Sequence, residues 1–143
     1  MSFEAVLTEL KEIARADSER RHGDRVSQFA HLTLVTDADI QKWSVSTELA
    51  RSALYDRIAI YLARGFHRSE LSFEFCDQVV NEIHGIIVRT NENRPTLYWE
   101  VFLAFDAGEF YRNSDRSRDP VDTYTRPLIA KVVEKHSTDY PDV

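Results

Sequence analysis

Acidic side chains recur at helical spacing in the middle of the chain. The residues of this series are Glu70, Glu74, Asp77 and Asn81. Their spacing of four, three and four residues places the side chains on one face of an α-helix. Like charges four residues apart cost a helix about 0.2–0.5 kcal/mol. A solvated helix face is the ordinary interpretation, and a surface that receives a cationic partner is the functional one.

A second acidic group follows the most hydrophobic segment of the chain, residues 97–105. Asp106 and Glu109 end this segment, and Asp115 lies in the polar stretch beyond it. The predicted partner-binding residues are Glu70, Glu74, Asp77, Asp106 and Glu109. Their charge predicts that the partner is a cationic protein.

Glu100 is the one charged residue inside segment 97–105. A buried carboxyl group has a raised pKa unless cations or hydrogen-bond donors surround it, and perturbed pKa values cluster at functional sites. The alternative hypothesis is therefore a small ligand-binding regulator or enzyme that uses this carboxyl group in an aromatic pocket. The residues of that pocket would be Glu100, Trp99, Tyr98 and Tyr124. The structural interpretation of Glu100 is an ion pair with Arg126 or Arg57, or an exposed position.

The sequence carries no motif of an enzyme. Its four glycines form no phosphate-binding loop, dinucleotide fingerprint or nucleophile elbow. No two of the five histidines lie four residues apart, the spacing with which one helix face binds a metal. Cys76 is a lone cysteine among apolar residues, where an inert side chain is expected. We therefore expect a non-enzymatic protein without a catalytic site, a metal or a cofactor.

Length and charge indicate a single domain spanning residues 1–143. Twenty-four acidic and 18 basic residues give a net charge of −6, which disfavours general nucleic-acid binding. Basic residues still gather locally, as Arg112, Arg116 and Arg118 do near the second acidic group. One cysteine allows no intrachain disulfide, and no apolar stretch approaches the roughly 18 residues that cross a bilayer. A cytoplasmic protein without membrane contact is expected.

Hydrophobic periodicity predicts an all-α bundle of about five helices. Apolar residues at i, i+3 and i+4 predict a first helix over residues 3–14, with a polar loop at 17–24. Thr36 and Asp39 form a capping pair before the next helical stretch. Few glycines and prolines interrupt the chain, which suits long helices better than short strands.

A central helix is predicted over residues 46–64, where alanine and leucine are frequent. Gly65 is a suitable stop for this helix. Ser69 can cap the next helix, whose apolar arc runs over residues 71–88.

Residues 91–95 are predicted to form a turn before the hydrophobic segment. A competing interpretation pairs the two sides of this turn as a β-hairpin over residues 86–105, which would make the fold α+β. Asp119 and Pro120 have the types of a helix start. Pro127 should kink the final helix or restart it after Thr125.

Four short patterns at helix boundaries lie within residues 61–134. They are Tyr61-Leu62-Ala63-Arg64-Gly65, Ser69-x-Leu71 with Phe75, Phe102-x-x-x-Asp106-x-x-x-Phe110, and Asp119-Pro120. In these patterns the chain resembles the small helical immunity proteins of bacteriocins, especially the colicin D immunity type. The resemblance implies a cytoplasmic inhibitor that fills the active cleft of a cognate toxin, commonly a nuclease, with acidic side chains in place of substrate phosphates. The arginines at 112, 116 and 118 depart from that expectation.

Three function hypotheses follow. The first is an acidic helical binding module, most concretely an immunity-type inhibitor of a cationic bacterial toxin. The second is the ligand-binding regulator or enzyme built around Glu100. The third is a homo-oligomer that uses the aromatic segment 97–105 as its interface.

Overall fold

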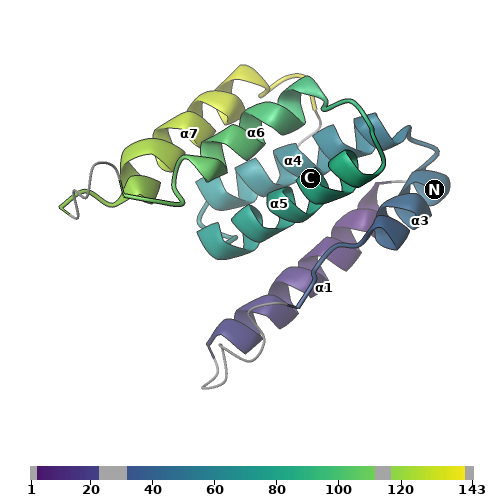
Figure 1. Cartoon of the computed structure of the whole chain (residues 1–143), viewed down its shortest axis with the longest axis horizontal. Coiled ribbons are helices and arrows are strands. Elements are labelled where there is room, and N and C mark those ends of the chain that lie inside the picture. The colour runs from purple at the N-terminus through teal and green to yellow at the C-terminus, as the bar shows by residue number, and fades with distance from the viewer. Residues whose placement is uncertain (1–2, 23–31, 112–116, 141–143) are drawn as a thin grey trace.

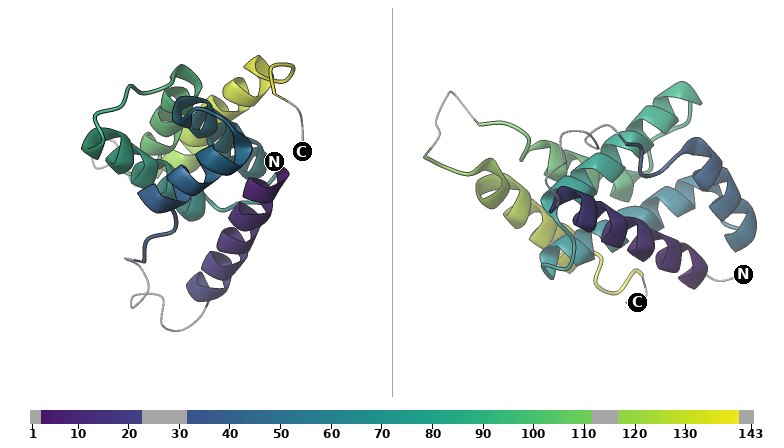
Figure 2. Two further views of the ribbon diagram at one scale, coloured as in Figure 1. Left: turned by 90° about the vertical axis from the view of Figure 1, so that its right-hand side faces the viewer. Right: turned by 90° about the horizontal axis from the view of Figure 1, so that it is seen from below.

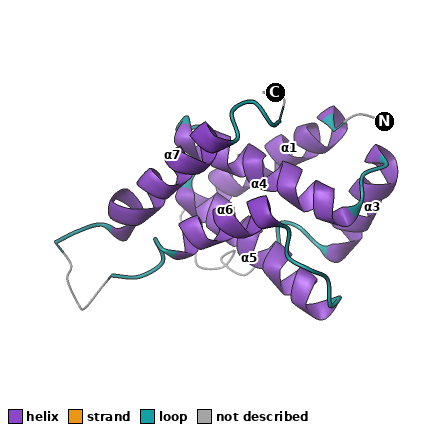
Figure 3. Cartoon of the chain, turned by 90° about the horizontal axis from the view of Figure 1, so that it is seen from above, coloured by secondary structure: helices purple, strands orange, loops and turns teal. Residues whose placement is uncertain are grey.

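The computed structural model describes residues 3–22, 32–111 and 117–140 (Figure 1). These residues form six α-helices and one π-helical turn: α1 Glu4–Arg21, α3 Asp37–Thr47, α4 Arg51–His67, α5 Phe73–Arg89, α6 Thr96–Asp106, η1 Val121–Thr125 and α7 Arg126–Lys135. The all-α prediction is confirmed. The hairpin interpretation of residues 86–105 is wrong, because α5 continues to Arg89 and α6 begins at Thr96; the described part of the chain contains no strand (Figure 3).

The helix α4 is the centre of the structure and contacts α3, α5, α6 and α7. Leu54, Ile58 and Leu62 are fully buried along it, and small alanines between them permit the close approach of its neighbours. Helices α6 and α7 lie on one side of α4 and α5, and α1 lies on the other side (Figure 2). No helix in the described ranges has the length and apolar character needed to cross a membrane.

The first helix is longer than its apolar pattern indicates. It continues into the segment predicted as a loop and ends at Arg21, and the last two residues of that predicted loop, 23 and 24, lie outside the described residues. Asp17 is buried in this extension and accepts a hydrogen bond from Arg21 Nε at 2.7 Å. Arg21 in turn donates to Gln78 Oε1 on α5 at 2.8 Å. Polar residues therefore continue the helix by contacts that hydrophobic periodicity does not detect.

The segment predicted as one central helix from residue 46 is divided. The capping box of Thr36 and Asp39 is confirmed at the start of α3. That helix ends at Thr47, where Glu48 takes a left-handed conformation with φ 59°. The next helix, α4, begins at Arg51 and passes through Gly65, so this glycine does not stop it.

Gly65 has a packing role instead. An added Cβ would lie 2.4 Å from Leu71 Cδ1, so only glycine lets the following turn fold back over α4. Its carbonyl accepts hydrogen bonds from the N–H groups of Glu70 and Leu71, at 2.8 and 3.1 Å. Ser69 lies in this turn with φ 62°, and the cap of α5 is Ser72, not Ser69. Glu70 therefore precedes α5 and does not belong to its polar stripe.

The final helix restarts at the predicted position. A π-helical turn, η1, ends at Thr125, and α7 begins at Arg126 with Pro127 in its first turn. A proline is tolerated there because the first N–H groups of a helix have no intrahelical acceptor. The side chain of Asp119 accepts a hydrogen bond from Val121 N–H at 2.9 Å, as its position before Pro120 suggests.

Candidate partner-binding surface

Three predicted partner-binding residues meet where α5 passes the end of α6. We call Asp77 on α5, Asp106 at the end of α6 and Glu109 in the following turn the acidic cluster. The amide of Asn81 donates to Asp77 Oδ1 at 3.2 Å and to Glu109 Oε2 at 3.0 Å. The carboxyl groups of Asp77 and Glu109 are also hydrogen-bonded to each other. Side chains separated by about 30 residues in the sequence therefore form one site.

The turn that carries Glu109 is fixed from the opposite side. Thr125 is buried and donates its hydroxyl hydrogen to the carbonyl of Ala104 at 2.8 Å. A Cβ at Gly108 would lie 2.3 Å from Thr125 Oγ1 and 3.0 Å from Phe73 Cε1. Because glycine leaves this space free, η1 and α5 both pack closely against the turn, and the carboxyl groups are presented by a rigid frame.

Burial raises the pKa of Asp77 to about 8, and the hydrogen bond and charge of Glu109 and the charge of Asp106 act in the same direction. Asn81 opposes this by donating a hydrogen bond. Near neutral pH, the cluster consequently retains a proton that an isolated aspartic acid would have lost.

No lysine or arginine of the described chain forms an ion pair with a member of the cluster. Glu74 is exposed one helical turn before Asp77 on α5. Directly after Glu109, the chain exposes Phe110 and Tyr111, with 59% and 41% of their surfaces accessible. Among the described residues, the surface thus joins carboxyl groups that have no basic ion-pair partner with exposed aromatic side chains, a combination suited to protein contacts.

The remaining predicted partner-binding residue lies elsewhere. Glu70 is exposed and lines a cleft between α1 and α4. Arg118 is exposed, whereas Asp115, Arg112 and Arg116 lie outside the described residues.

The raised pKa of Asp77 makes a prediction for stability. The folded state binds this proton more tightly than the unfolded chain does, so the free energy of unfolding falls as pH rises from about 4 through about 8. Asp77→Asn resembles the protonated form. We expect it to raise the free energy of unfolding by about 1–2 kcal/mol at pH 9 and by little at pH 4, because one pKa unit is about 1.4 kcal/mol and solvent screens this partly exposed group.

Urea denaturation of both proteins at the two pH values measures this effect. Asp122→Asn is the control, since Asp122 is exposed and pairs with Arg126 at 2.7 Å. A stabilisation by Asp77→Asn that is the same at pH 4 and pH 9 would contradict the raised pKa.

The residues of the predicted aromatic pocket do not converge. Tyr98 is fully buried and donates its hydroxyl hydrogen to Val80 O at 2.6 Å. Trp99 stacks on Phe102, with ring centroids 4.7 Å apart. Glu100 is directed toward α7 and is paired with Lys135 at 3.2 Å. Tyr98 and Trp99 both lie against Phe102, whereas Glu100 projects toward α7, because consecutive helical residues project about 100° apart.

One detail of Glu100 differs from the prediction. Its ion-pair partner is Lys135, not Arg126 or Arg57, and His136 Nε2 lies 3.8 Å from its Oε1. Its side chain is 31% exposed. Tyr124 is half-buried on η1. The ion-pair interpretation of Glu100 therefore agrees with the structure, apart from the identity of the cation.

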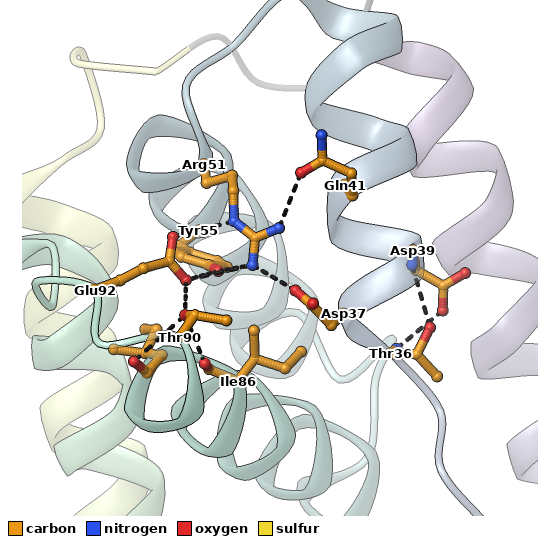
Figure 4. A network of polar contacts seen from close by, with 10 residues as sticks. Thr36, Asp37, Asp39, Gln41, Arg51, Tyr55, Ile86, Thr90 and Glu92 are labelled. Atoms are coloured by element: carbon orange, nitrogen blue, oxygen red, sulfur yellow. Dashed lines mark hydrogen bonds and ion pairs between the residues drawn. The ribbon is translucent and has the colours of Figure 1, made fainter.

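A polar network at the start of α4 was not predicted (Figure 4). Arg51 binds Glu92 through Nε at 3.0 Å and Asp37 through Nη2 at 2.5 Å. Glu92 also accepts hydrogen bonds from Tyr55 at 2.7 Å and Thr90 at 2.6 Å. Burial alone would raise the pKa of Glu92, but these hydrogen bonds, led by that from Arg51, lower it. The network joins α3, α4 and the turn after α5.

A single signal could have indicated this network. Arg51 stands in the first turn of α4, where a cation is unfavourable to the helix dipole. Such a residue favours carboxylate partners, and two acidic residues beside neighbouring helix ends are Asp37, at the start of α3, and Glu92, in the turn after α5. The distance of 41 residues between Arg51 and Glu92 hides the pairing from the sequence.

Within residues 3–22, 32–111 and 117–140, no group of three or more His, Cys, Asp or Glu side chains is arranged to hold a metal ion. Comparisons with protein-family models, curated proteins and solved structures gave no match.

Proposed function

We propose that the chain is a non-enzymatic binding module whose acidic cluster, together with Glu74, receives a cationic protein. One observation carries this proposal. Three carboxyl groups lie together where α5 passes the end of α6, and no basic side chain among the described residues pairs with them. A partner lysine or arginine would supply the missing charge and replace the retained proton. The exposed aromatic rings after Glu109 would add apolar contact area.

The most concrete form of the proposal is an immunity-type inhibitor of a cationic bacterial toxin, acting in the cytoplasm. A nuclease binds phosphates in a cationic cleft, and closely spaced carboxylates can occupy the same positions. The resemblance to colicin D immunity proteins supports this form, because one of its patterns includes Asp106 of the acidic cluster and the exposed Phe110.

Salt and pH dependence test the proposed function. The basic protein that the immobilised chain captures from its native cell is purified and titrated against the chain. We expect its affinity to fall as salt rises from 0.05 to 0.5 M, because ions screen charges beyond about 10 Å at 0.1 M. We also expect tighter binding at pH 9 than at pH 6, because the partner must displace the proton of Asp77. Affinity that is independent of both variables would contradict the proposal.

A further inference from the structure

A cleft of about 640 Å³ lies between α1 and α4, beside the start of α5. This volume is within the range of sites for small organic ligands, about 300–1,000 Å³. The helix α1 is attached on both sides of it. Its first half packs into the core through Val6, Leu7 and Leu10, and its end is held by Arg21 on Gln78. Residues of the helical turns between these attachments form one wall of the cleft.

The walls of the cleft combine apolar surface with positive charge. The apolar side chains that line it include Phe3, Ala14, Ile60, Tyr61, Leu71 and Phe75. The basic side chains are Lys11, Arg15, Arg57, Arg64 and Arg68. Only three acidic residues line the cleft, namely Asp17, Glu19 and Glu70. The cleft is therefore locally cationic in a chain whose net charge is −6.

Arg57 is the cation best placed to meet a ligand. Its guanidinium group lies over the ring of Phe3, 4.6 Å from the centroid, and the residue as a whole is half-buried. No carboxylate of the described residues pairs with it. By contrast, Arg15 is neutralised by Glu12 and Glu19 on its own helix. The guanidinium group of Arg57 can thus donate two parallel hydrogen bonds to a carboxylate beside an apolar wall.

We propose that this cleft binds an alkyl carboxylate, with its head group at Arg57 and its chain along the apolar wall. The lining residues of α1 and its cap extend from Phe3 to Glu19, about 24 Å at 1.5 Å per residue, so the cleft suits an elongated ligand. The basic side chains of the cleft favour an anionic head group, and its apolar side chains favour an alkyl chain. The acidic cluster is not part of this site, so the proposal is independent of the proposed function.

Isothermal titration calorimetry with dodecanoate, below its micelle concentration, tests the proposal. We expect saturable binding at one site and none by the cationic analogue dodecyltrimethylammonium. Ala14→Trp should fill the cleft and weaken dodecanoate binding at least tenfold, whereas Ala5→Trp, on the exposed face of α1, should not. Arg57→Gln should weaken binding about tenfold, and Arg89→Gln, whose side chain is exposed away from the cleft, should leave it unchanged.

Circular dichroism establishes whether each variant is folded. If Ala14→Trp does not fold, the effect of Arg57→Gln on dodecanoate binding still tests the proposal. Absence of saturable dodecanoate binding overturns the proposal. Equal binding of the cationic analogue, or equal effects of Arg57→Gln and Arg89→Gln, does so too. Reversal of charges in the acidic cluster should leave dodecanoate binding intact, which separates this site from the partner surface.

Discussion

The double variant Glu74→Lys and Glu109→Lys should lose at least a hundredfold in affinity for the cationic partner. Each substitution converts an attractive contact into a repulsive one at the proposed surface, and a hundredfold loss corresponds to about 2.7 kcal/mol. Both side chains are exposed, so the fold should be retained. Titration of the purified partner against wild-type and variant chains measures the loss.

Glu4→Lys with Glu134→Lys is the matched control. Both of these side chains are also exposed, and the pair changes the net charge by the same amount on other surfaces of the molecule. If the control pair weakens binding as much as the pair at the acidic cluster, long-range charge and not the cluster determines affinity. The acidic cluster would then be excluded as the contact surface.

Arg51→Met should lower the free energy of unfolding by about 2–3 kcal/mol. The substitution leaves Glu92 half-buried without its cation, and the hydrogen bonds of charged groups are worth about 1.5–3 kcal/mol each. Removal of the positive charge at the start of α4 stabilises that helix by up to about 1 kcal/mol, because a cation there opposes the helix dipole. This gain partly offsets the loss of the free energy of unfolding. Chemical denaturation of the variant measures the change.

Arg126→Met is the comparison, because its ion pair with Asp122 is exposed and should be worth less than about 1 kcal/mol. A double-mutant cycle of Arg51→Met with Glu92→Gln separates the contribution of the ion pair from the loss of the arginine side chain. A coupling energy near zero would show that the network does not stabilise the junction of α3, α4 and the turn after α5.

Local sequence signals predicted the elements whose causes are local. The capping box at Thr36, the turn after α5 and the restart of α7 after Thr125 all depend on residues within a few positions of one another. The acidic cluster was predicted in part for a related reason. Asp77 lies on the polar face of an amphipathic helix, and Asp106 and Glu109 mark the end of an apolar one.

Long-range contacts determine the features that the sequence did not predict. The carboxylate of Glu82 accepts hydrogen bonds from the N–H groups of Leu34 and Val35, at 3.0 and 2.9 Å, and so fixes the segment before α3 against α5. Leu71 packs directly against Gly65, so this glycine serves close packing and does not end the helix. Each case depends on a residue that is close only after folding, and hydrophobic periodicity contains no information about such pairs.

The position of α1 at the edge of the bundle has a consequence for its stability. Contacts among α4, α5, α6 and α7 do not pass through α1, so we expect local opening of α1 to cost less free energy than opening of α4. Its opening would uncover the cleft along its whole length. The cleft is already lined by exposed side chains such as Lys11 and Glu70, so it is open to solvent while α1 is in place, and opening of α1 would widen an existing entrance.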